Sequence, residues 1–282
     1  MVVKEEAPKI IREEIEYNET QELMLKWSIA YPYIRCIYCH GGVRSGKSLG
    51  LCKIAQIISQ KFPMSKTLIA RDTRVNLKNT TLKTFFGYDF FGRPVVMPQL
   101  YRERDYNKTE GYLKWLNGSE TYFWGMENPD DISRVKSTEW SAILIEEADA
   151  LDVAVIQFLL ETRLSHPQGP HKMMLTSNTD TGHSDLYRLF YETHDLAKNP
   201  GEICDHCGIE CEFRTIPSTT LGNEQNLPDN YVRRIKRMEF SDPRMYKVYV
   251  MGEFMEFTKK IFPEFDQNTH IVDIPASWVP PP

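Results

Sequence analysis

A glycine-rich turn between an apolar run and a helical pattern limits most strongly what this chain can fold into. Residues 40–50, HGGVRSGKSLG, place Gly41, Gly46, Lys47 and Ser48 in the spacing G-x-x-x-x-G-K-[ST]. Glycines at these positions let backbone N–H groups converge on an anion, while the lysine neutralises outer phosphates and the serine hydroxyl can ligate Mg²⁺. The helix that begins here would point its positive end at the same phosphates. The predicted phosphate-binding loop comprises Gly41, Gly42, Val43, Arg44, Ser45, Gly46, Lys47 and Ser48.

Strand-like and helix-like segments alternate along the whole chain. Apolar, β-branched runs typical of buried parallel strands occur at 34–38, 66–70, 141–145 and 172–178. Patterns typical of helices occur at 20–30, 47–62, 76–90 and 153–165. A hairpin is expected at 111–125, around Asn117-Gly118. The alternation predicts an α/β fold with a mostly parallel central sheet flanked by helices. Together with the phosphate-binding motif, it indicates a P-loop NTPase.

Two adjacent carboxylates follow one of the predicted strands, in the segment AILIEEAD at 142–149. Ligands of open α/β sheets bind at the carboxyl edge, so Glu146 and Glu147 are expected beside the phosphate loop. We predict that Glu146 joins Ser48 in holding Mg²⁺, and that Glu147, on the opposite side of the strand, polarises water for attack on the γ-phosphate of ATP. The usual first residue here is aspartate, so Glu146 is a departure. An acidic cap for the next helix, and a chance glycine turn instead of a phosphate loop, are the alternatives.

The next predicted strand also ends in polar residues, Thr176, Ser177 and Asn178. At the carboxyl edge of the sheet they are positioned to sense the γ-phosphate and to pass its loss on to a moving segment. Polar strand ends are common, so an ordinary structural role is the alternative.

Charge and hydropathy narrow the class of protein. Lys and Arg number 34 against 39 Asp and Glu, giving a net charge of −5, so a nucleic-acid partner would need local basic patches. Candidates are Arg233, Arg234, Lys236 and Arg237, with 71–83 and 102–108 as other patches and a solvated helix face as the alternative. No apolar run approaches the roughly 20 residues of a membrane span, and the N-terminus lacks the apolar centre of a secretion signal. We expect a soluble, intracellular protein with no membrane contact.

Three cysteines, Cys204, Cys207 and Cys211, fall within eight residues. The spacing C-x2-C-x3-C is typical of metal ligation and predicts Zn²⁺, with His194 or His206 as the fourth ligand. Free or transiently oxidised thiols are the alternative.

Taken in order, these segments resemble the ATPase portion of the large terminase subunit of tailed bacteriophages, over most of residues 15–265. The resemblance runs through NETQELML, GGVRSGKS, LIARDTRVNLKNTTLKTF, NGSETYFWGMENPDDISRVKSTEWSAILIEEAD, LLETRLSH, MMLTSNTDTGHSDLYRLF and LPDNYVRRIKRMEFSDPRMYKVYVMGEF. It implies an ATP-hydrolysing motor that translocates double-stranded DNA into a procapsid in the host cytoplasm. Implied partners are the portal and small terminase proteins, with a homo-oligomeric ring when assembled and a monomer in isolation.

The resemblance also implies roles for three further residues. Gln21 would read the adenine edge, and Arg44 would be a second cation that follows the γ-phosphate. Arg134 would reach the ATP site of a neighbouring subunit and stabilise transition-state charge, which makes it catalytic together with Lys47 and Glu147. A surface glutamine and a solvated arginine are the alternatives for the first two, and Lys136 and Arg163 compete with Arg134.

The expected domain division has four parts. A tail and an adenine-side helix occupy 1–30, and the ATPase core occupies 31–214 with a zinc-binding insertion near 194–211. A lid follows at 215–256, and 257–282 forms a linker toward a nuclease domain that we expect to be absent from the chain. Rival functions are a helicase-like or remodelling ATPase on nucleic acid, and a nucleotide-gated assembly protein.

Overall fold

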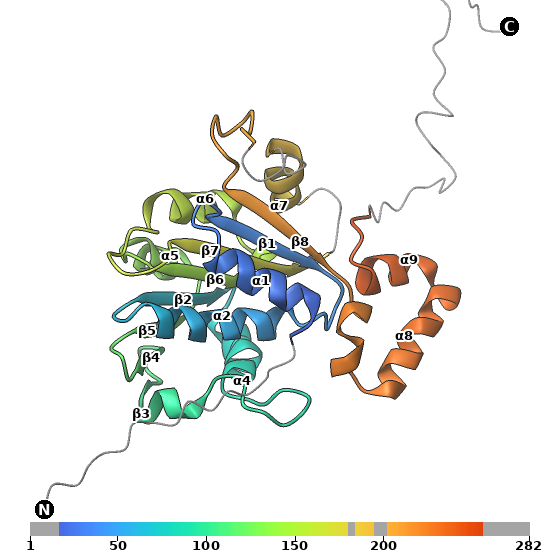
Figure 1. Ribbon diagram of the computed structural model, residues 1–282, viewed down its shortest axis with the longest axis horizontal. Helices are drawn as coiled ribbons and strands as arrows, with labels where there is room; N and C mark the ends of the chain where they lie inside the picture. Colours follow the sequence, from blue (N-terminus) through green and yellow to red (C-terminus); the bar gives the residue numbers. More distant parts are fainter. Residues whose placement is uncertain (1–16, 180–183, 195–201, 256–282) are drawn as a thin grey trace, which may run out of the picture.

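The computed structural model describes residues 17–179, 184–194 and 202–255 (Figure 1). The strands are β1 (Cys36–Gly41), β2 (Lys66–Arg71), β3 (Tyr101–Asn107), β4 (Tyr112–Trp115), β5 (Glu120–Gly125), β6 (Ala142–Glu146), β7 (Lys172–Asn178) and β8 (Phe213–Ser218). The α-helices are α1 (Glu19–Ile29), α2 (Lys47–Lys61), α3 (Arg74–Asn79), α4 (Thr81–Phe85), α5 (Pro129–Lys136), α6 (Val153–Thr162), α7 (Asp185–Tyr187), α8 (Asp229–Ser241) and α9 (Pro243–Met245). Shorter helical turns are η1 (Pro98–Leu100), η2 (Ala148–Ala150), η3 (Arg188–Thr193), η4 (Leu221–Asn226) and η5 (Tyr246–Val250).

All eight described strands form one sheet, in the order β3-β4-β5-β2-β6-β7-β1-β8. Along the sheet, the pairs β5-β2, β2-β6, β6-β7, β7-β1 and β1-β8 are parallel. The pairs β3-β4 and β4-β5 at the other end are antiparallel. The central strands β1, β2 and β6 are buried almost throughout, which explains why their sequences are continuous apolar runs without alternation. The predicted α/β class and mostly parallel sheet are therefore confirmed, as is the hairpin at 111–125.

Side chains alternate between two cores, one on each face of the sheet. On β1, Ile37 and Cys39 enter the core that contains α1, α2 and α4, and Figure 1 shows α1 and α2 side by side across this face. Cys36 and Tyr38 enter the other core, which contains α5, α6 and η3. Each fully buried aliphatic side chain contributes about 1.5–3 kcal/mol, so the two faces fix the register of the sheet and with it the positions of the strand ends.

The C-terminal part of the described chain lies beside the end of β1. Figure 1 shows α8 and α9 next to each other at the edge where β1 and β8 end. The expected lid boundary at 215 differs from the structure, because β8 (Phe213–Ser218) pairs with β1 and belongs to the sheet. Pro217 disguises this strand, since proline is tolerated only at a sheet edge, which is where β8 lies. The expected tail at 1–16 and linker at 257–282 fall outside the described residues.

Among the described residues, no helix combines the length and apolar character that crossing a membrane requires.

Candidate functional site

The predicted phosphate loop connects β1 to α2 in a conformation that few other residues could adopt. Gly41 and Gly46 have φ angles of 137° and 92°, in the region that favours glycine. A Cβ at Gly41 would lie 1.9 Å from the carbonyl oxygen of Ser218, and one at Gly46 would lie 2.7 Å from Nε2 of Gln21. The glycines of the motif are therefore required by the backbone and by its close neighbours.

Backbone amides in the middle of the loop are available to an anion. Arg44 and Gly46 both have positive φ, and such backbone turns let successive N–H groups converge. No acceptor for the amides of Arg44, Ser45 or Gly46 occurs among the residues that the structure describes. Gly46 is also the N-cap of α2, so the positive end of that helix faces the same position. Ser48 lies in the first turn of α2, directly after Lys47.

Lys47 lies folded back over the loop. Its Nζ donates hydrogen bonds to the carbonyl oxygens of Gly41 (3.2 Å) and Gly42 (2.7 Å) and to Oγ of Ser45 (3.1 Å). Burial lowers the pKa of Lys47 to about 8, although the nearby charge of Glu146 acts in the opposite direction. A phosphate group would offer this ammonium a stronger partner than neutral carbonyls.

The two predicted carboxylates meet a residue that the sequence analysis did not assign to the site. Arg71 ends β2, the neighbour of β6, and its Nη1 lies 3.4 Å from Oε2 of Glu146. Nη2 of Arg71 pairs with Glu147, and Oγ1 of Thr81 donates to Glu146. Glu147 has a φ of 52°, which turns the chain as β6 ends. We expected the two carboxylates on opposite sides of the strand; in the structure Glu147 follows the last residue of β6, and both carboxylates reach one guanidinium.

Exposure distinguishes the two carboxylates. The side chain of Glu146 is 7% exposed, whereas that of Glu147 is 44% exposed. Glu146 therefore has the partners and burial of a positioned oxygen donor, and Glu147 has access to water. The position of Arg71 at the end of a predicted strand could have pointed to the site. That inference requires knowing that β2 lies beside β6.

Strand β7 joins the loop side of the site to the carboxylate side. Thr176 lies level with Cys39 of β1 and with Glu146 of β6, and Asn178 lies level with Gly41. Thr176 and Ser177 are buried, and the Ser177 hydroxyl hydrogen-bonds to the Tyr38 hydroxyl at 2.7 Å.

The two ends of this polar segment differ. Oγ1 of Thr176 donates to the carbonyl of Ile145 at 3.5 Å, whereas Asn178 is exposed at the strand end. Thr179, which the sequence analysis did not select, donates its amide to Gly41 (3.2 Å) and its Oγ1 to the carbonyl of Gly252 (3.0 Å). Thr179 thus contacts both the loop and the stretch that follows η5.

The last residue of β8 and residues after it hold the first half of the phosphate loop. The amide of Gly42 donates to the carbonyl of Ser218, and the amide of Val43 donates to that of Tyr249, both at 2.8 Å. Oγ1 of Thr220 donates to the carbonyl of Val43 at 2.6 Å. The described part of the lid therefore touches the loop directly.

Arg44 and Gln21 are both placed by neighbours of the loop. The guanidinium of Arg44 lies 4.8 Å from the ring centroid of Tyr231 on α8, so in this structure it faces the lid. Gln21 caps α1 by accepting from the amide of Asn18, and its Nε2 donates to the carbonyl of Gly46 at 3.1 Å. Gln21 and Gly46 also line one cavity with Tyr17. Gln21 is therefore beside the loop, and its adenine role remains a prediction.

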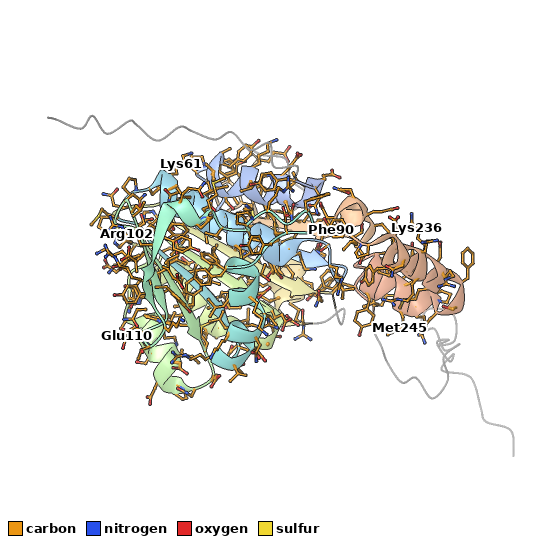
Figure 2. All side chains as sticks on the ribbon, turned by 90° about the horizontal axis from the view of Figure 1, so that it is seen from below. Lys61, Phe90, Arg102, Glu110, Lys236 and Met245 are labelled. Atoms are coloured by element: carbon orange, nitrogen blue, oxygen red, sulfur yellow. The ribbon has the colours of Figure 1, made fainter. Side chains whose placement is uncertain are left out.

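Arg134 lies far from the loop of its own chain. It is on α5, which follows β5, four strand positions from β1; four spacings amount to about 19 Å. Its guanidinium lies 3.9 Å from the ring centroid of Trp124 and 3.2 Å from the carboxylate of Glu110. In Figure 2, Glu110 lies at the opposite end of the molecule from Lys236 and Met245 of the lid.

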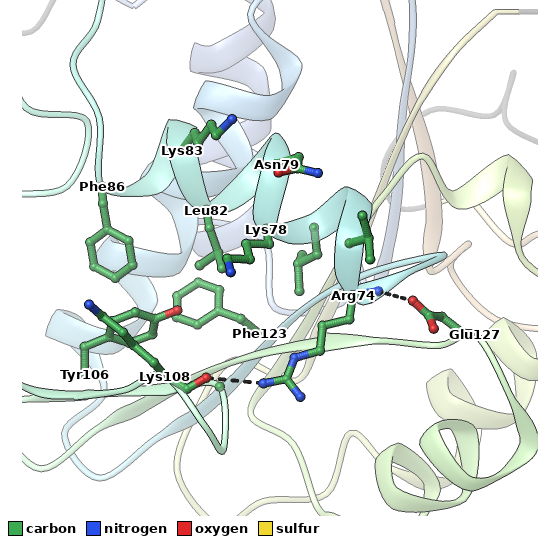
Figure 3. Close-up of a pocket in the computed structure, with 13 residues that line it drawn as sticks. Arg74, Lys78, Asn79, Leu82, Lys83, Phe86, Tyr106, Lys108, Phe123 and Glu127 are labelled. Atoms are coloured by element: carbon green, nitrogen blue, oxygen red, sulfur yellow. Dashed lines mark hydrogen bonds between the residues drawn. The ribbon is translucent and has the colours of Figure 1, made fainter.

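A second hollow opens beside this distant end of the sheet (Figure 3). The cavity has a volume of about 980 Å³ and an aromatic floor that includes Phe86 and Phe123. Its cationic lining residues are Arg74, Lys78, Lys83 and Lys108. Basic patches predicted separately at 71–83 and 102–108 thus meet around one cavity, which none of the phosphate-loop residues lines.

The predicted metal ligands also come together. The ligand atoms of His194, Cys204, Cys207 and Cys211 all lie within 4.8 Å of one another. His206, the alternative fourth ligand, is not part of this group, and its ring meets that of His194 edge-on with centroids 4.8 Å apart.

Comparisons with known proteins agree with this geometry. A sequence model of the family described as phage terminase large subunit matches residues 35–253. The PBSX phage terminase large subunit of Bacillus subtilis (strain 168) is 26% identical over 161 residues, covering 56% of this chain and 36% of that protein. The chain thus aligns with little more than a third of its curated relative.

Two solved structures have a similar fold. The large terminase of the thermophilic bacteriophage D6E superposes with a TM-score of 0.65 at 16% identity, covering 94% of this chain and 60% of that one. The ATPase domain of the Thermus phage P74-26 large terminase gives a TM-score of 0.57 at 12% identity, covering 85% of this chain and 94% of that one. Because the family match at 35–253 spans every described strand and continues to the end of η5, the chain belongs to the phage terminase large subunit family.

Proposed function

We propose that this chain binds and hydrolyses ATP with Mg²⁺, and that hydrolysis drives double-stranded DNA into a procapsid. The observation that carries the proposal is the meeting of an amide-rich loop, Lys47 and the pair Glu146 and Glu147 at one edge of the sheet. Further support comes from the D6E large terminase, a relative in fold that has been solved with ADP and with ATP-γ-S.

Each residue of the loop edge has a distinct proposed task. Amides of residues 44–46 and the ammonium of Lys47 bind the triphosphate, with Gln21 at the adenine. Ser48 and Glu146 fit Mg²⁺, since they offer the hydroxyl and carboxylate oxygens that this hard cation prefers, and Mg²⁺ would neutralise phosphate charge. Glu147 polarises the attacking water, for which its partial exposure suits it.

Arg71 has a proposed positioning role between the two carboxylates. Its guanidinium holds Glu146 and Glu147 from the same side, and it is itself buried. A fixed Arg71 restricts Glu147 to a small range of positions near the sheet edge, which lowers the entropic cost of aligning water.

Product release would reach the lid through contacts already described. Thr176, Ser177 and Asn178 line the strand between loop and carboxylates, and Thr179 bonds to both Gly41 and Gly252. A change of phosphate state at the loop therefore bears directly on the segment 218–252, which is the proposed moving lid.

Arg134 completes the site of a neighbouring subunit in this proposal. Its distance from its own loop and its place at the same carboxyl edge of the sheet suit a donor that acts across a ring interface. The proposed assembly is a homo-oligomeric ring that works with portal and small terminase proteins in the host cytoplasm.

The cavity of Figure 3 is the surface that we propose for DNA. Its four cations surround aromatic side chains, and phosphate contacts of this kind carry no sequence preference, which suits movement along arbitrary DNA. On α8, by contrast, Lys236 pairs with Glu224 and Arg234 lies over Tyr231, so part of that basic face already has partners.

The test is ATP turnover by the chain with Lys47→Ala beside the matched control Lys61→Ala, an exposed lysine at the other end of α2. We expect turnover that requires Mg²⁺, a loss of roughly 10²–10³-fold in kcat/KM for Lys47→Ala, and wild-type values for the control. Turnover that persists in Lys47→Ala, or nucleotide binding without any turnover at high protein concentration, would overturn the proposal.

A further inference from the structure

We infer that His194, Cys204, Cys207 and Cys211 bind one structural Zn²⁺, which ties the connection between β7 and β8 to the sheet. This site lies outside the proposed ATP chemistry, and its ligands come from two segments: the residue after η3 and the stretch just before β8.

Distances between the ligand atoms are close to those of a filled site. Nδ1 of His194 lies 3.3 Å from Sγ of Cys207 and 3.9 Å from Sγ of Cys211, and no pair in the group exceeds 4.8 Å. Tetrahedral zinc with bonds of about 2.0–2.3 Å places neighbouring ligand atoms roughly 3.5–3.8 Å apart. Closure around a metal ion therefore requires side-chain shifts of about 1 Å or less.

A tight backbone turn over residues 204–209 brings the first two thiols close together. Gly208, directly after Cys207, has a φ of 67° and donates its amide to the carbonyl of Cys204 at 2.8 Å. The amide of Cys204 donates to the carbonyl of Ile209, also at 2.8 Å, and Ile203 pairs with Glu210 in an antiparallel bridge. This small closed turn brings Cys204 and Cys207 together without any helix or long strand.

Two apolar side chains of this segment are largely exposed. Ile203 and Ile209 are 63% and 55% exposed, whereas Cys204 and Cys211 are buried. The buried thiols thus occupy positions that apolar side chains hold in an ordinary core. In segments of this size, a bound metal contributes folding free energy that a hydrophobic core would otherwise supply. A disulfide would leave one of the three thiols over, and none of the six cysteines forms one.

The fourth ligand is anchored to the sheet. The ring of His194 stacks on Phe213, the first residue of β8, with centroids 3.7 Å apart and planes 18° apart. Phe213 in turn packs against Phe190 of η3 at 5.4 Å. A metal held by His194 and the three thiols therefore joins η3, which comes after β7 in the chain, to the start of β8. Both β7 and β8 pair with β1.

Zinc here would act at a distance from the ATP site. Phe213 is level with Cys36 at the start of β1, whereas Ser218 is level with Gly41, five residues or about 16 Å further along. One contact links the two ends: Tyr191 of η3 hydrogen-bonds to His40, directly before the phosphate loop, at 2.6 Å. We therefore assign the metal a structural role that fixes β8 and η3 against β1.

The experiment is elemental analysis of the full chain, purified under reducing conditions without chelator. We expect about one zinc ion per chain, a loss of at least threefold in zinc content for Cys207→Ser and for His194→Asn, and unchanged zinc in His206→Asn and Cys52→Ala. Cys52 is a buried cysteine of α2 outside the cluster. Protein with less than a tenth of an ion per chain, or with iron in place of zinc, would overturn the assignment.

A second measurement keeps the inference testable where a variant fails to fold. Wild-type protein stripped with chelator and reloaded with Co²⁺ should show the absorption of a tetrahedral thiolate site. It should also regain the protease resistance that stripping removes near 188–213. If Co²⁺ binds without that spectrum, or stripping leaves proteolysis unchanged, the metal does not hold these segments together.

Discussion

In the proposed function, the two ends of the sheet carry complementary halves of a phosphoryl-transfer site. At the β1 and β8 end, the loop, Lys47 and Glu146 offer amides, an ammonium and carboxylate oxygens, and the lid contacts the loop directly. At the β5 end, Arg134 is a cation on an exposed helix, with an aromatic ring and one carboxylate as neighbours. One end has a place for phosphates but no arginine finger within the described chain, and the other has the arginine but no such place. The proposed site is therefore one that two subunits complete together.

Replacing Arg134 tests that division most severely. Arg134→Ala should lower kcat by roughly 10³–10⁵-fold in the assembled motor, because a trans arginine stabilises charge that develops only in the transition state. Binding of ATP should change little. The measurement is turnover against protein concentration, which should rise steeply for wild type and stay flat for the variant.

Lys136→Ala is the matched control on the same helix. Lys136 lies 4.7 Å from the ring centroid of Phe158, so its charge also sits on an aromatic face. If Lys136→Ala lost most of its kcat while Arg134→Ala stayed active, the residue that acts on the neighbouring subunit would be a cation other than Arg134. Equal losses in both would point to a disturbed α5 instead.

Glu147→Gln tests the loop end of the comparison. The substitution keeps size and hydrogen bonding but removes the negative charge, so kcat should fall by roughly 10²–10⁴-fold while ATP affinity stays within a few-fold. Single-turnover hydrolysis together with fluorescent-nucleotide binding separates the two quantities. Glu161→Gln, at an exposed position of α6 beside Arg35, should behave as wild type. Full hydrolysis in Glu147→Gln would assign water activation elsewhere.

The pH dependence of ATP binding sharpens the role of Lys47. Burial lowers the pKa of Lys47 to about 8 in the free protein, and a bound triphosphate favours the charged form and raises that pKa. Below pH 8 the lysine is already charged, so affinity should be nearly constant. Above pH 8 binding must take up a proton, and affinity should fall by up to tenfold per pH unit. Titrations from pH 7 to 10 should show this slope in wild type and a weak, flat profile in Lys47→Ala.

Local patterns in the sequence were enough for much of the fold and for the loop. The motif from Gly41 to Ser48 and the apolar runs of β1, β2, β6 and β7 depend only on neighbouring residues, and the structure agrees with both. The metal cluster was also visible, since three of its ligands are close in sequence.

What the sequence did not reveal depends on strand order. Arg71 joins the site only because β2 lies beside β6, and Thr179 matters only because β7 lies beside β1 and near the lid. The predicted lid boundary at 215 cuts through β8, whereas the whole strand pairs with β1. Choosing His194 over His206 likewise required a tertiary contact, the stacking on Phe213. Side-chain chemistry was readable from the sequence, whereas the neighbours that complete each site were not.

The smallest expected effect concerns how firmly the lid rests on the loop. Tyr231 of α8 lies under the guanidinium of Arg44, an interaction worth about 0.5–1 kcal/mol at an exposed site. Tyr231→Leu should therefore lower the hydrogen-exchange protection of the Val43 amide by about two- to fivefold, since this amide donates to the carbonyl of Tyr249 across the interface between loop and lid. Phe240→Leu, at a highly exposed position on the same helix, is the control and should leave protection unchanged. If ATP-γ-S restores protection in Tyr231→Leu, the lid closes on the nucleotide itself. If neither Tyr231→Leu nor nucleotide changes hydrogen-exchange protection, the lid does not respond to the loop. ATP binding at the β1 and β8 end would then not move the lid.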